Sequence, residues 1–214
     1  GNRGVVVVTF DSDAPRSKRL CYYGTDDAYC GRTVMRELAK AMGGKGVVAI
    51  LAGNQSAPNL QKRVAAVREE LKNHPGIKEL NDGKGVFYHP ETPEDAARAM
   101  QSAQTTNPQI TGWALVGGWP LFTKGAIKTP PGQVKVVSVD ALPAQLPYVK
   151  EGYVEALYAQ DCYGWGYKSV ELLLEKIVNN KEPESTNIID PLTKVTKENV
   201  DEFGKNWEKW LDGQ

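Results

Sequence analysis

Polar side chains stand directly after several apolar, β-rich runs, at the positions where predicted strands end. Asp11 follows residues 5–10, and Asp140 follows residues 134–139. Two carboxylates at strand ends can accept hydrogen bonds from neighbouring hydroxyl groups, or they can form the acid/base pair of a glycoside hydrolase. The residues that follow predicted strands are Asp11, Thr25-Asp26-Asp27, Gly53-Asn54-Gln55, Gly117-Gly118-Trp119, Asp140 and Gln160. The acids, amides, hydroxyl and tryptophan of this set suit a ligand covered with hydroxyl groups.

The common signatures of nucleotide binding and catalysis are absent from the sequence. It contains no GxGxxG, no Walker loop, no GxSxG and no HExxH. Its two histidines, His74 and His89, each adjoin a proline, and we interpret both as solvated surface side chains. Without an activated nucleophile, Asp11 and Asp140 are better explained as hydrogen-bond acceptors. We therefore expect a binding protein rather than an enzyme, with no cofactor and no metal.

The composition is that of a globular chain without an electrostatic bias. Of the 214 residues 41% are hydrophobic, enough for the core of one large or two small domains. Lys and Arg number 26, as do Asp and Glu, and this zero formal charge favours neither a nucleic-acid nor an anionic-membrane partner. No apolar run approaches the roughly 18 residues of a membrane span. The three cysteines, Cys21, Cys30 and Cys162, are irregularly spaced, and this spacing predicts neither a disulfide framework nor a zinc site.

These candidate residues need a scaffold, and short β-rich runs that alternate with longer helical runs supply one. Alternating strands and helices predict βαβ units and a mostly parallel sheet with flanking helices, which is an α/β fold. In such sheets ligands bind at the carboxyl ends of the strands. The predicted strands are 5–10, 20–23, 47–51, 113–116, 134–139 and 153–159, and the predicted helices are 28–42, 57–73, 163–178, one that begins at 92–95 and one that begins at 196.

Three local patterns make more specific predictions. Residues 5–10 form a continuous run of mainly β-branched residues, typical of a strand that is buried on both faces. Residues 77–80 and 86–88 flank Asn81-Asp82-Gly83-Lys84, whose turn-forming residues favour a β-hairpin. The helix at 163–178 carries an apolar stripe made by Tyr167, Val170, Leu174 and Ile177.

Four motifs in order along the chain resemble those of a known family. Each motif alone is weak, but together they span nearly the whole sequence. They are Val-Val-Thr-Phe-Asp at 7–11, Tyr-Gly-Thr-Asp-Asp at 23–27 followed by Gly31-Arg32, the helix start at 59–63 after Gly53, and Val-Val-Ser-Val-Asp at 136–140 followed by Gln160. The chain thereby resembles the type I periplasmic sugar-binding proteins of ABC transporters, relatives of the ribose-, galactose- and glucose-binding proteins. Asp-Ser-Asp-Ala-Pro at 11–15 is most similar to a glucose-binding branch.

This resemblance implies a periplasmic-binding-protein-like type I fold, with two α/β lobes joined by crossing strands and a sugar held between them. Because family members extend further at the N-terminus, the chain is expected to be a truncated or processed form without its signal peptide. It would contain one complete lobe and parts of a second. Residues 1–26 would be a remnant of the N-terminal lobe and the first hinge, 27–160 the C-terminal lobe, 161–189 a segment returning to the N-terminal lobe, and 190–214 a C-terminal tail helix.

The resemblance also implies a function. The protein would bind a glucose-like or ribose-like monosaccharide and deliver it to the membrane permease of an ABC importer, in the periplasm or lipid-anchored outside the cell. A further partner would be the missing N-terminal lobe or a second copy of the chain. The alternative is an effector-binding domain of a lactose-repressor-like transcription regulator, which shares this fold. The Trp- and Lys-rich C-terminal helix and the long loop at 179–195 favour the transporter and no nucleic-acid partner.

The family motifs place the sugar contacts on particular residues of this sequence. Several of them also have a structural interpretation, because Asp11 could cap a turn, Asn59 could act in the first turn of its helix, and Arg63 could be a solvated helix residue. Carried over by motif, the residues that would contact the sugar are Asp11, Asn59, Arg63, Asp140 and Gln160.

The chain departs from the family pattern after the strand at 113–116. Many relatives carry Asn-Asp there, whereas this chain has Gly117-Gly118-Trp119-Pro120. One polar contact with the sugar would be lost. Trp119 would either replace that contact by stacking on the sugar ring or belong to the core.

Overall fold

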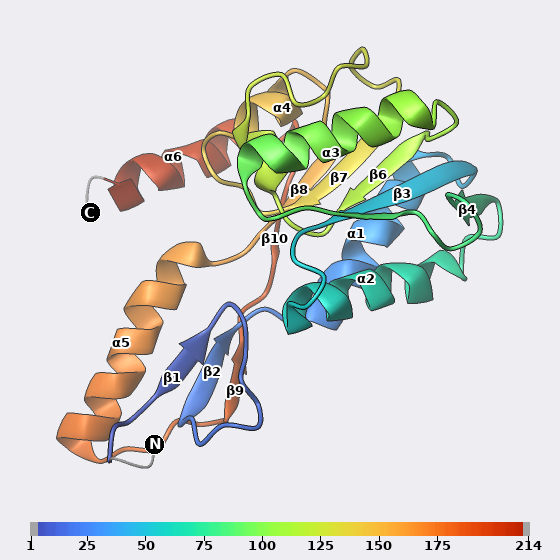
Figure 1. The fold of residues 1–214 in the computed structure, drawn as a ribbon. Helices are drawn as coiled ribbons and strands as arrows, with labels where there is room; N and C mark the ends of the chain where they lie inside the picture. Colours follow the sequence, from blue (N-terminus) through green and yellow to red (C-terminus); the bar gives the residue numbers. More distant parts are fainter. Residues whose placement is uncertain (1–3, 212–214) are drawn as a thin grey trace. The chain divides into compact units, whose positions relative to one another are not determined.

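The computed structural model describes residues 4–211, which divide into two compact units (Figure 1). The larger unit comprises Asp27–Ala159 and Thr193–Gln214, and the smaller unit comprises Gly1–Asp26 and Gln160–Leu192. The chain therefore passes from the smaller unit to the larger one, returns, and enters the larger unit again. Each unit has its own sheet and is described by itself.

Among the described residues, the larger unit contains a seven-stranded sheet in which each pair of strands except one is parallel. The exception is β10, which lies antiparallel to β8 at one edge. The strand order is β10-β8-β7-β6-β3-β4, with β5 also beside β3. The strands are β3 (Gly46–Ala52), β4 (Ile77–Glu79), β5 (Val86–Tyr88), β6 (Gly112–Leu115), β7 (Lys135–Val139), β8 (Ala156–Ala159) and β10 (Thr193–Val195).

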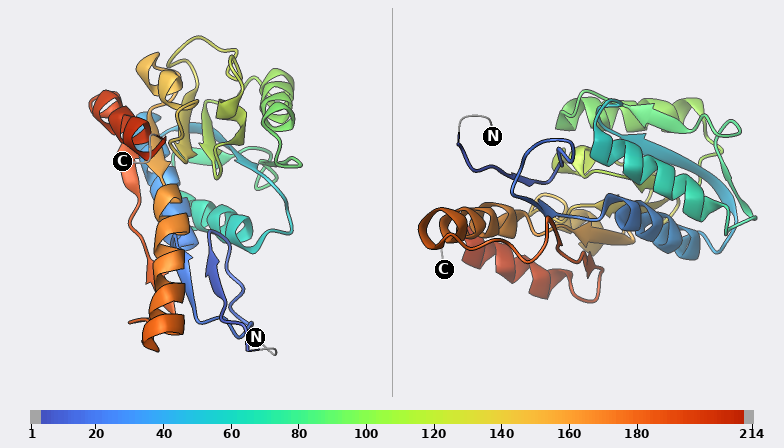
Figure 2. Two further views of the ribbon diagram at one scale, coloured as in Figure 1. Left: turned by 90° about the vertical axis from the view of Figure 1, so that its left-hand side faces the viewer. Right: turned by 90° about the horizontal axis from the view of Figure 1, so that it is seen from below.

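Helices cover both faces of this sheet, with α1 and α2 on one face and α3 on the other (Figures 1 and 2). The core between these layers includes Trp113, Leu115 and Val136, which are fully buried. Thr92 caps α3, as the sequence predicts, by accepting a hydrogen bond from the backbone N–H of Asp95. The helices are α1 (Asp27–Ala41), α2 (Pro58–Leu71), α3 (Pro93–Thr106), the 3-10 helix η1 (Trp119–Phe122), α4 (Leu146–Lys150) and α6 (Val200–Leu211).

The predicted hairpin at 77–88 is wrong. Strands β4 and β5 do not pair with each other, because both run parallel to β3. Strand β4 pairs with the first part of β3, from Gly46 to Val48, and β5 pairs with the last part, from Ile50 to Ala52. The turn-forming residues at 81–84 therefore lie in a loop that connects two successive strands of the same direction, and the chain does not reverse.

The smaller unit contains, within residues 4–26 and 160–192, a three-stranded parallel sheet and the helix α5 (Cys162–Asn179). Strand β2 (Cys21–Gly24) lies between β1 (Val8–Phe10) and β9 (Asn187–Ile189). Helix α5 packs against β1 and β2. This unit follows the α/β plan of the larger one but has fewer layers to enclose a core.

Many apolar side chains of the smaller unit are exposed. The prediction that residues 5–10 form a strand buried on both faces is wrong for the described residues, since Val5 is 61% and Phe10 51% exposed. The apolar sequence of this strand suits burial on two faces, but among the described residues α5 is the only helix that packs against it. On α5 the predicted stripe is exposed along its length, with exposed fractions of 54–65% at Tyr167, Val170, Leu174 and Ile177.

The predicted α/β fold with mostly parallel sheets is confirmed. Within residues 4–211, no helix combines the length and the apolar character that crossing a membrane requires.

Candidate functional site

Four of the six predicted site residues lie in the larger unit, near the carboxyl edge of its sheet. Asp140 directly follows β7, and Trp119 lies four residues beyond Leu115, the last residue of β6. Asn59 and Arg63 lie in the first two turns of α2, which begins after β3. The parallel arrangement of β3, β6 and β7 brings these residues to one edge, as the sequence predicts.

Arg63 is buried at this edge, with only 2% of its surface exposed. Its Nε donates a hydrogen bond to Oδ1 of Asp27 at 2.8 Å, and its Nη1 donates to the carbonyl oxygen of Val116 at 3.1 Å. Burial alone would lower the pKa of Arg63, but the neighbouring Cys30, Asp27 and Asp140 raise it above its usual value. Arg63 is therefore a charged crosslink between α2, the start of α1 and the end of β6.

Asp140 and Asn59 are the two other polar residues predicted for this edge. Asp140 adopts the left-handed backbone conformation, with φ of 69°, and its Oδ2 accepts a hydrogen bond from the N–H of Gly118 at 3.0 Å. A Cβ atom at Gly118 would lie 2.6 Å from the side-chain amide nitrogen of Gln145 and 3.0 Å from that carboxylate oxygen, so a side chain at position 118 would displace these groups. Asn59 is half-buried and lies one helical turn before Arg63.

Trp119 lies across the ends of two strands. A Cβ atom at Gly117 would approach its indole to 2.0 Å, and one at Gly53 would approach it to 3.0 Å, so the ring occupies space that side chains at these positions would fill. The imidazole of His89 packs against it with ring centroids 5.3 Å apart at 74°. Trp119 is half-buried and contacts the core. The core role that the sequence left open for it is therefore observed, whereas stacking on a ligand stays a prediction.

His89 and Glu91 also belong to this edge, although sequence reasoning missed both. The interpretation of His89 as a solvated side chain is wrong, because it is 7% exposed and burial lowers its pKa against the opposing influence of Glu91 and Asp95. Oε1 of Glu91 accepts a hydrogen bond from the N–H of Asn54 at 3.1 Å. Both residues follow β5, and treating 86–88 as the return strand of a hairpin left its carboxyl end out of the predicted edge.

The other two predicted residues, Asp11 and Gln160, lie in the smaller unit. Asp11 directly follows β1 with φ of 57°, and its carbonyl oxygen accepts a hydrogen bond from the hydroxyl of Tyr22 at 2.9 Å. Oε1 of Gln160 accepts a hydrogen bond from the hydroxyl of Thr25 at 2.9 Å. Both residues are half-buried.

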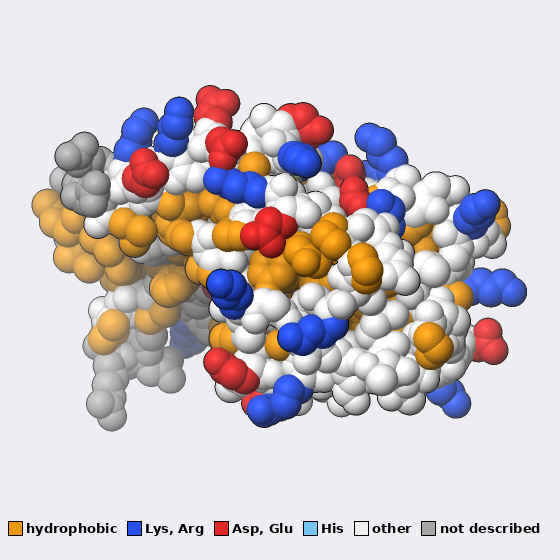
Figure 3. All heavy atoms as spheres, turned by 90° about the horizontal axis from the view of Figure 1, so that it is seen from above, with side chains coloured by type: hydrophobic (Ala, Val, Ile, Leu, Met, Phe, Trp, Pro, Cys, Tyr) orange, Lys and Arg blue, Asp and Glu red, His pale blue; other side chains and the backbone are white. Residues whose placement is uncertain are grey.

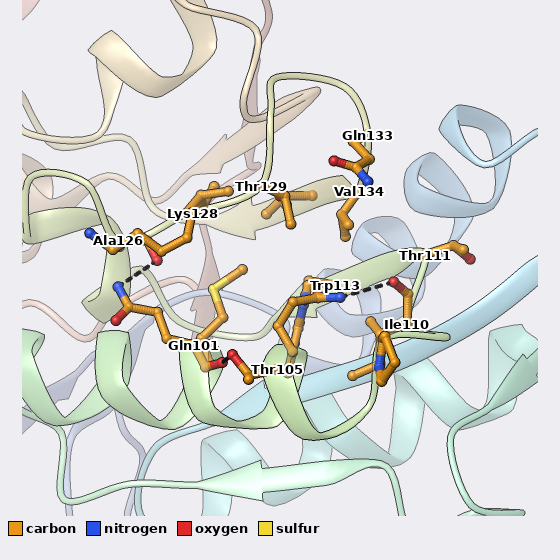
Figure 4. Close-up of a pocket in the computed structure, with 15 residues that line it drawn as sticks. Gln101, Thr105, Ile110, Thr111, Trp113, Ala126, Lys128, Thr129, Gln133 and Val134 are labelled. Carbon is orange, nitrogen blue, oxygen red and sulfur yellow. Dashed lines mark hydrogen bonds between the residues drawn. The ribbon is translucent and has the colours of Figure 1, made fainter.

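A cavity of about 390 Å³ lies elsewhere in the larger unit, between α3 and the residues that lead into β6 and β7 (Figure 4). None of the six predicted residues lines it. Gln104 uses both ends of its amide there, accepting from Nε1 of Trp113 at 2.8 Å and donating to the carbonyl of Ile110 at 3.2 Å. Gln101 donates to the carbonyl of Ala126 at 2.9 Å. The cavity is thus separate from the candidate site, and the amides of Gln101 and Gln104 at its wall are bonded within the protein.

The chemistry of the candidate site is that of hydrogen bonding and ring stacking. Its groups are a buried guanidinium, carboxylates, an amide and an indole. In the part of the chain that the structure describes, no three His, Cys, Asp or Glu side chains are placed to hold a metal ion. On the face shown in Figure 3, the described Lys and Arg side chains are interspersed with Asp and Glu. This donor and acceptor set fits a neutral, hydroxyl-rich ligand better than a nucleic acid or a strongly charged one.

Comparison with known proteins extends this result. The model of the periplasmic binding protein domain family matches residues 1–182. A search of curated proteins finds no match. Among solved structures, an ABC transporter solute-binding protein from Burkholderia graminis, in complex with D-arabinose, is 27% identical with a TM-score of 0.83, and the match covers 93% of this chain and 69% of that one. A glucose-galactose binding protein from Geobacillus stearothermophilus is 26% identical with a TM-score of 0.80, covering 92% and 69%.

Proposed function

Because the chain belongs to the periplasmic binding protein family, we propose that it binds a monosaccharide as the solute-binding component of an ABC importer. The observation that carries this proposal is the carboxyl edge of the larger unit, where Arg63, Trp119 and Asp140 gather. The similar structures, one in complex with D-arabinose and one of a glucose-galactose binding protein, agree with it.

Each group at this edge has a role in the proposed complex. The carboxylate of Asp140 accepts hydrogen bonds from sugar hydroxyls, each worth about 1.5–3 kcal/mol because the acceptor is charged. Trp119 offers a flat face to the apolar C–H groups of a sugar ring. Gly117 and Gly118 have no side chains, and the space this leaves at the strand end is taken by the Trp119 indole and the Asp140 carboxylate.

Arg63 is proposed to act mainly from behind these groups. Its hydrogen bonds to Asp27 and Val116 fix the ends of α1 and β6, and its positive charge interacts with the carboxylate of Asp140. Asn59 is proposed to reach the sugar from the same helix. Asp11 and Gln160 of the smaller unit are proposed to contribute a carboxylate and an amide to sugar recognition.

The family also supports proposals about partners and location. A solute-binding protein of this kind delivers its sugar to the membrane permease of the importer, which places it in the periplasm or on the outer side of the cell.

We also propose that the exposed apolar side chains of the smaller unit are covered by further polypeptide of the N-terminal lobe or by a second copy of the chain. Size-exclusion chromatography with light scattering tests this, and a monomer in which these side chains stay exposed would contradict it.

Titration calorimetry tests the function directly. The protein is titrated with D-arabinose, D-glucose, D-galactose and D-ribose, and it is incubated with their nitrophenyl glycosides. We expect one-to-one binding of at least one sugar and no hydrolysis product. Failure of all four sugars to bind would contradict the proposed function, and stereospecific hydrolysis would replace it with catalysis.

A variant locates the site. Asp140→Asn keeps the size of the side chain and removes its charge, so we expect affinity to fall about 10- to 100-fold. Asp201→Asn is the matched control, because Asp201 is an exposed residue of α6 paired with Lys150. Equal affinities for both variants would move the site away from Asp140.

A further inference from the structure

His89 is fixed by a tight turn at the end of β5. Its Nδ1 accepts a hydrogen bond from the backbone N–H of Glu91 at 3.1 Å. Because Nδ1 is the acceptor, the neutral ring must carry its proton on Nε2. That Nε2 is buried and has no hydrogen-bond partner among residues 4–211. Glu91, which closes the turn, adopts the left-handed conformation with φ of 57°.

This turn and Trp119 form one packed group above Gly53. The His89 and Trp119 rings meet edge to face, with centroids 5.3 Å apart. A Cβ atom at Gly53 would lie 2.6 Å from the Glu91 carboxylate and 3.0 Å from the Trp119 indole. The Glu91 carboxylate is held there by the N–H of Asn54. A change in the turn at 89–91 would therefore alter the surface against which Trp119 packs.

We propose that His89 is a positioning residue for Trp119 and that it fulfils this role only as the neutral imidazole, so that acid weakens monosaccharide binding. The inference rests on the proposed function, because Trp119 is taken to contact the sugar. It assigns no direct contact between His89 and the ligand.

Protonation is incompatible with the observed turn. The imidazolium carries a proton on both nitrogens, so Nδ1–H would face the N–H of Glu91 and two donors would meet. The second donor, Nε2–H, would carry charge in a buried position. The charged groups that face the ring are Glu91, in the turn itself, and Asp95, in the first turn of α3. Their attraction for a proton is smaller than the effect of burial, so the pKa of His89 stays below its usual value.

The sign of the pH dependence follows from this. Above about pH 6.5, the ordinary value for histidine, the ring is neutral in both the folded and the unfolded chain. As the pH falls through the lower folded-state pKa, the ring becomes charged and the turn is lost. We expect sugar affinity to decrease about three- to tenfold over this range, the size of the effect expected for one aromatic pair.

Two substitutions separate the ring from its proton. His89→Phe keeps a ring against Trp119 but can neither be protonated nor accept the N–H of Glu91. Its affinity for D-arabinose and D-glucose should therefore lie between those of the native protein and of His89→Ala at about pH 8, and it should not fall further at about pH 5. His89→Ala removes the ring, so affinity should be about three- to tenfold lower at both pH values. An unaltered acid loss in His89→Phe, or native affinity in His89→Ala, would overturn the proposal.

A second measurement needs neither sugar nor a substitution at His89. The chain has only two histidines, so nitrogen NMR of histidine-labelled protein resolves both rings, and His74→Gln assigns the other signal. We expect His89 to be the Nε2–H tautomer at about pH 7 and its protonation to change the fluorescence of Trp119, identified by its loss in Trp119→Phe. A charged ring or the Nδ1–H tautomer at that pH would contradict the proposal. Absence of sugar binding together with the expected NMR result would instead contradict the proposed function.

Discussion

In the larger unit the central strands are covered on both faces, and Ile50, Trp113 and Val137 are fully buried between helices. In the smaller unit the same kind of parallel sheet is covered by α5, and apolar side chains such as Phe10 and Ile177 are 51% and 65% exposed. The two regions have similar strand sequences, so the difference does not come from local propensity. It comes from the number of layers that each unit can assemble from the described chain.

This comparison shows that an apolar strand sequence indicates that the strand should be buried but does not indicate which element covers it. Full burial of a large apolar side chain is worth about 1.5–3 kcal/mol, and a small sheet needs a packed face to be stable. The larger unit meets this demand with its own helices. We therefore expect it to be the more stable unit, and hydrogen exchange with mass spectrometry can follow the two units separately.

The largest expected effect is at the buried ion pair of the larger unit. Arg63→Ala removes the guanidinium that forms a buried ion pair with Asp27, which should cost about 3–5 kcal/mol. Chemical denaturation, with hydrogen exchange to locate the change, should show that only the larger unit is destabilised. Arg98→Ala is the control, because its ion pair with Asp95 is exposed and should leave stability unchanged. A similar loss for both variants would show that the guanidinium of Arg63 is solvated in solution.

The second prediction compares one leucine from each unit. Leu115→Ala creates a cavity in the core and should cost about 2–5 kcal/mol. Leu174→Ala removes a side chain that is 54% exposed, and it should cost less than about 0.5 kcal/mol. Denaturation midpoints give both values. If Leu174→Ala costs as much as Leu115→Ala, the stripe on α5 is covered in solution and the contrast between the units disappears.

The smallest expected effect is an acid sensitivity of the smaller unit. Asp13 accepts hydrogen bonds from Arg19, which also donates to the carbonyl of Thr186 beside β9. Burial alone would raise the pKa of Asp13, but the bonds from Arg19 and Thr9 lower it below its usual 3.8. A depressed carboxyl pKa stabilises the fold above the unfolded-state value, and this stabilisation is lost as the pH falls through the folded-state value.

Hydrogen exchange of the smaller unit between about pH 5 and pH 3 can measure this loss. In Asp13→Asn the smaller unit should be less stable at about pH 5, and its stability should change less towards pH 3. An identical pH dependence in the native protein and in Asp13→Asn would show that the ion pair does not stabilise this unit.

Much of this structure could be predicted because alternation, caps and strand ends are local properties. The helix start at Thr92 and the placement of Asp140 after β7 needed only neighbouring residues. The pairing of β4 and β5 with β3 could not be read locally, because a turn sequence between two short strands is compatible with either arrangement. The burial of His89 could not be predicted for the same reason, because His89 packs against Trp119, which lies thirty positions further along the chain.

The site residues divide in the same way. The sequence indicates that Arg63 and Asp140 belong to one edge, and their electrostatic interaction is consistent with this. It could not indicate that Arg63 is paired with Asp27, because that contact joins two helices separated by a strand. Contact of any of these residues with sugar stays a prediction for the experiments above.

The divided edge of β3 has a consequence for aggregation. A long exposed strand edge presents a row of free N–H and C=O groups on which another chain can add a strand. In the larger unit that edge is occupied by two separate three-residue strands, β4 and β5, with the loop at 80–85 between them. At the opposite edge stands β10, which is equally short. Neither border offers an uninterrupted template, so the larger unit is protected against edge-to-edge polymerisation by the brevity of its outer strands.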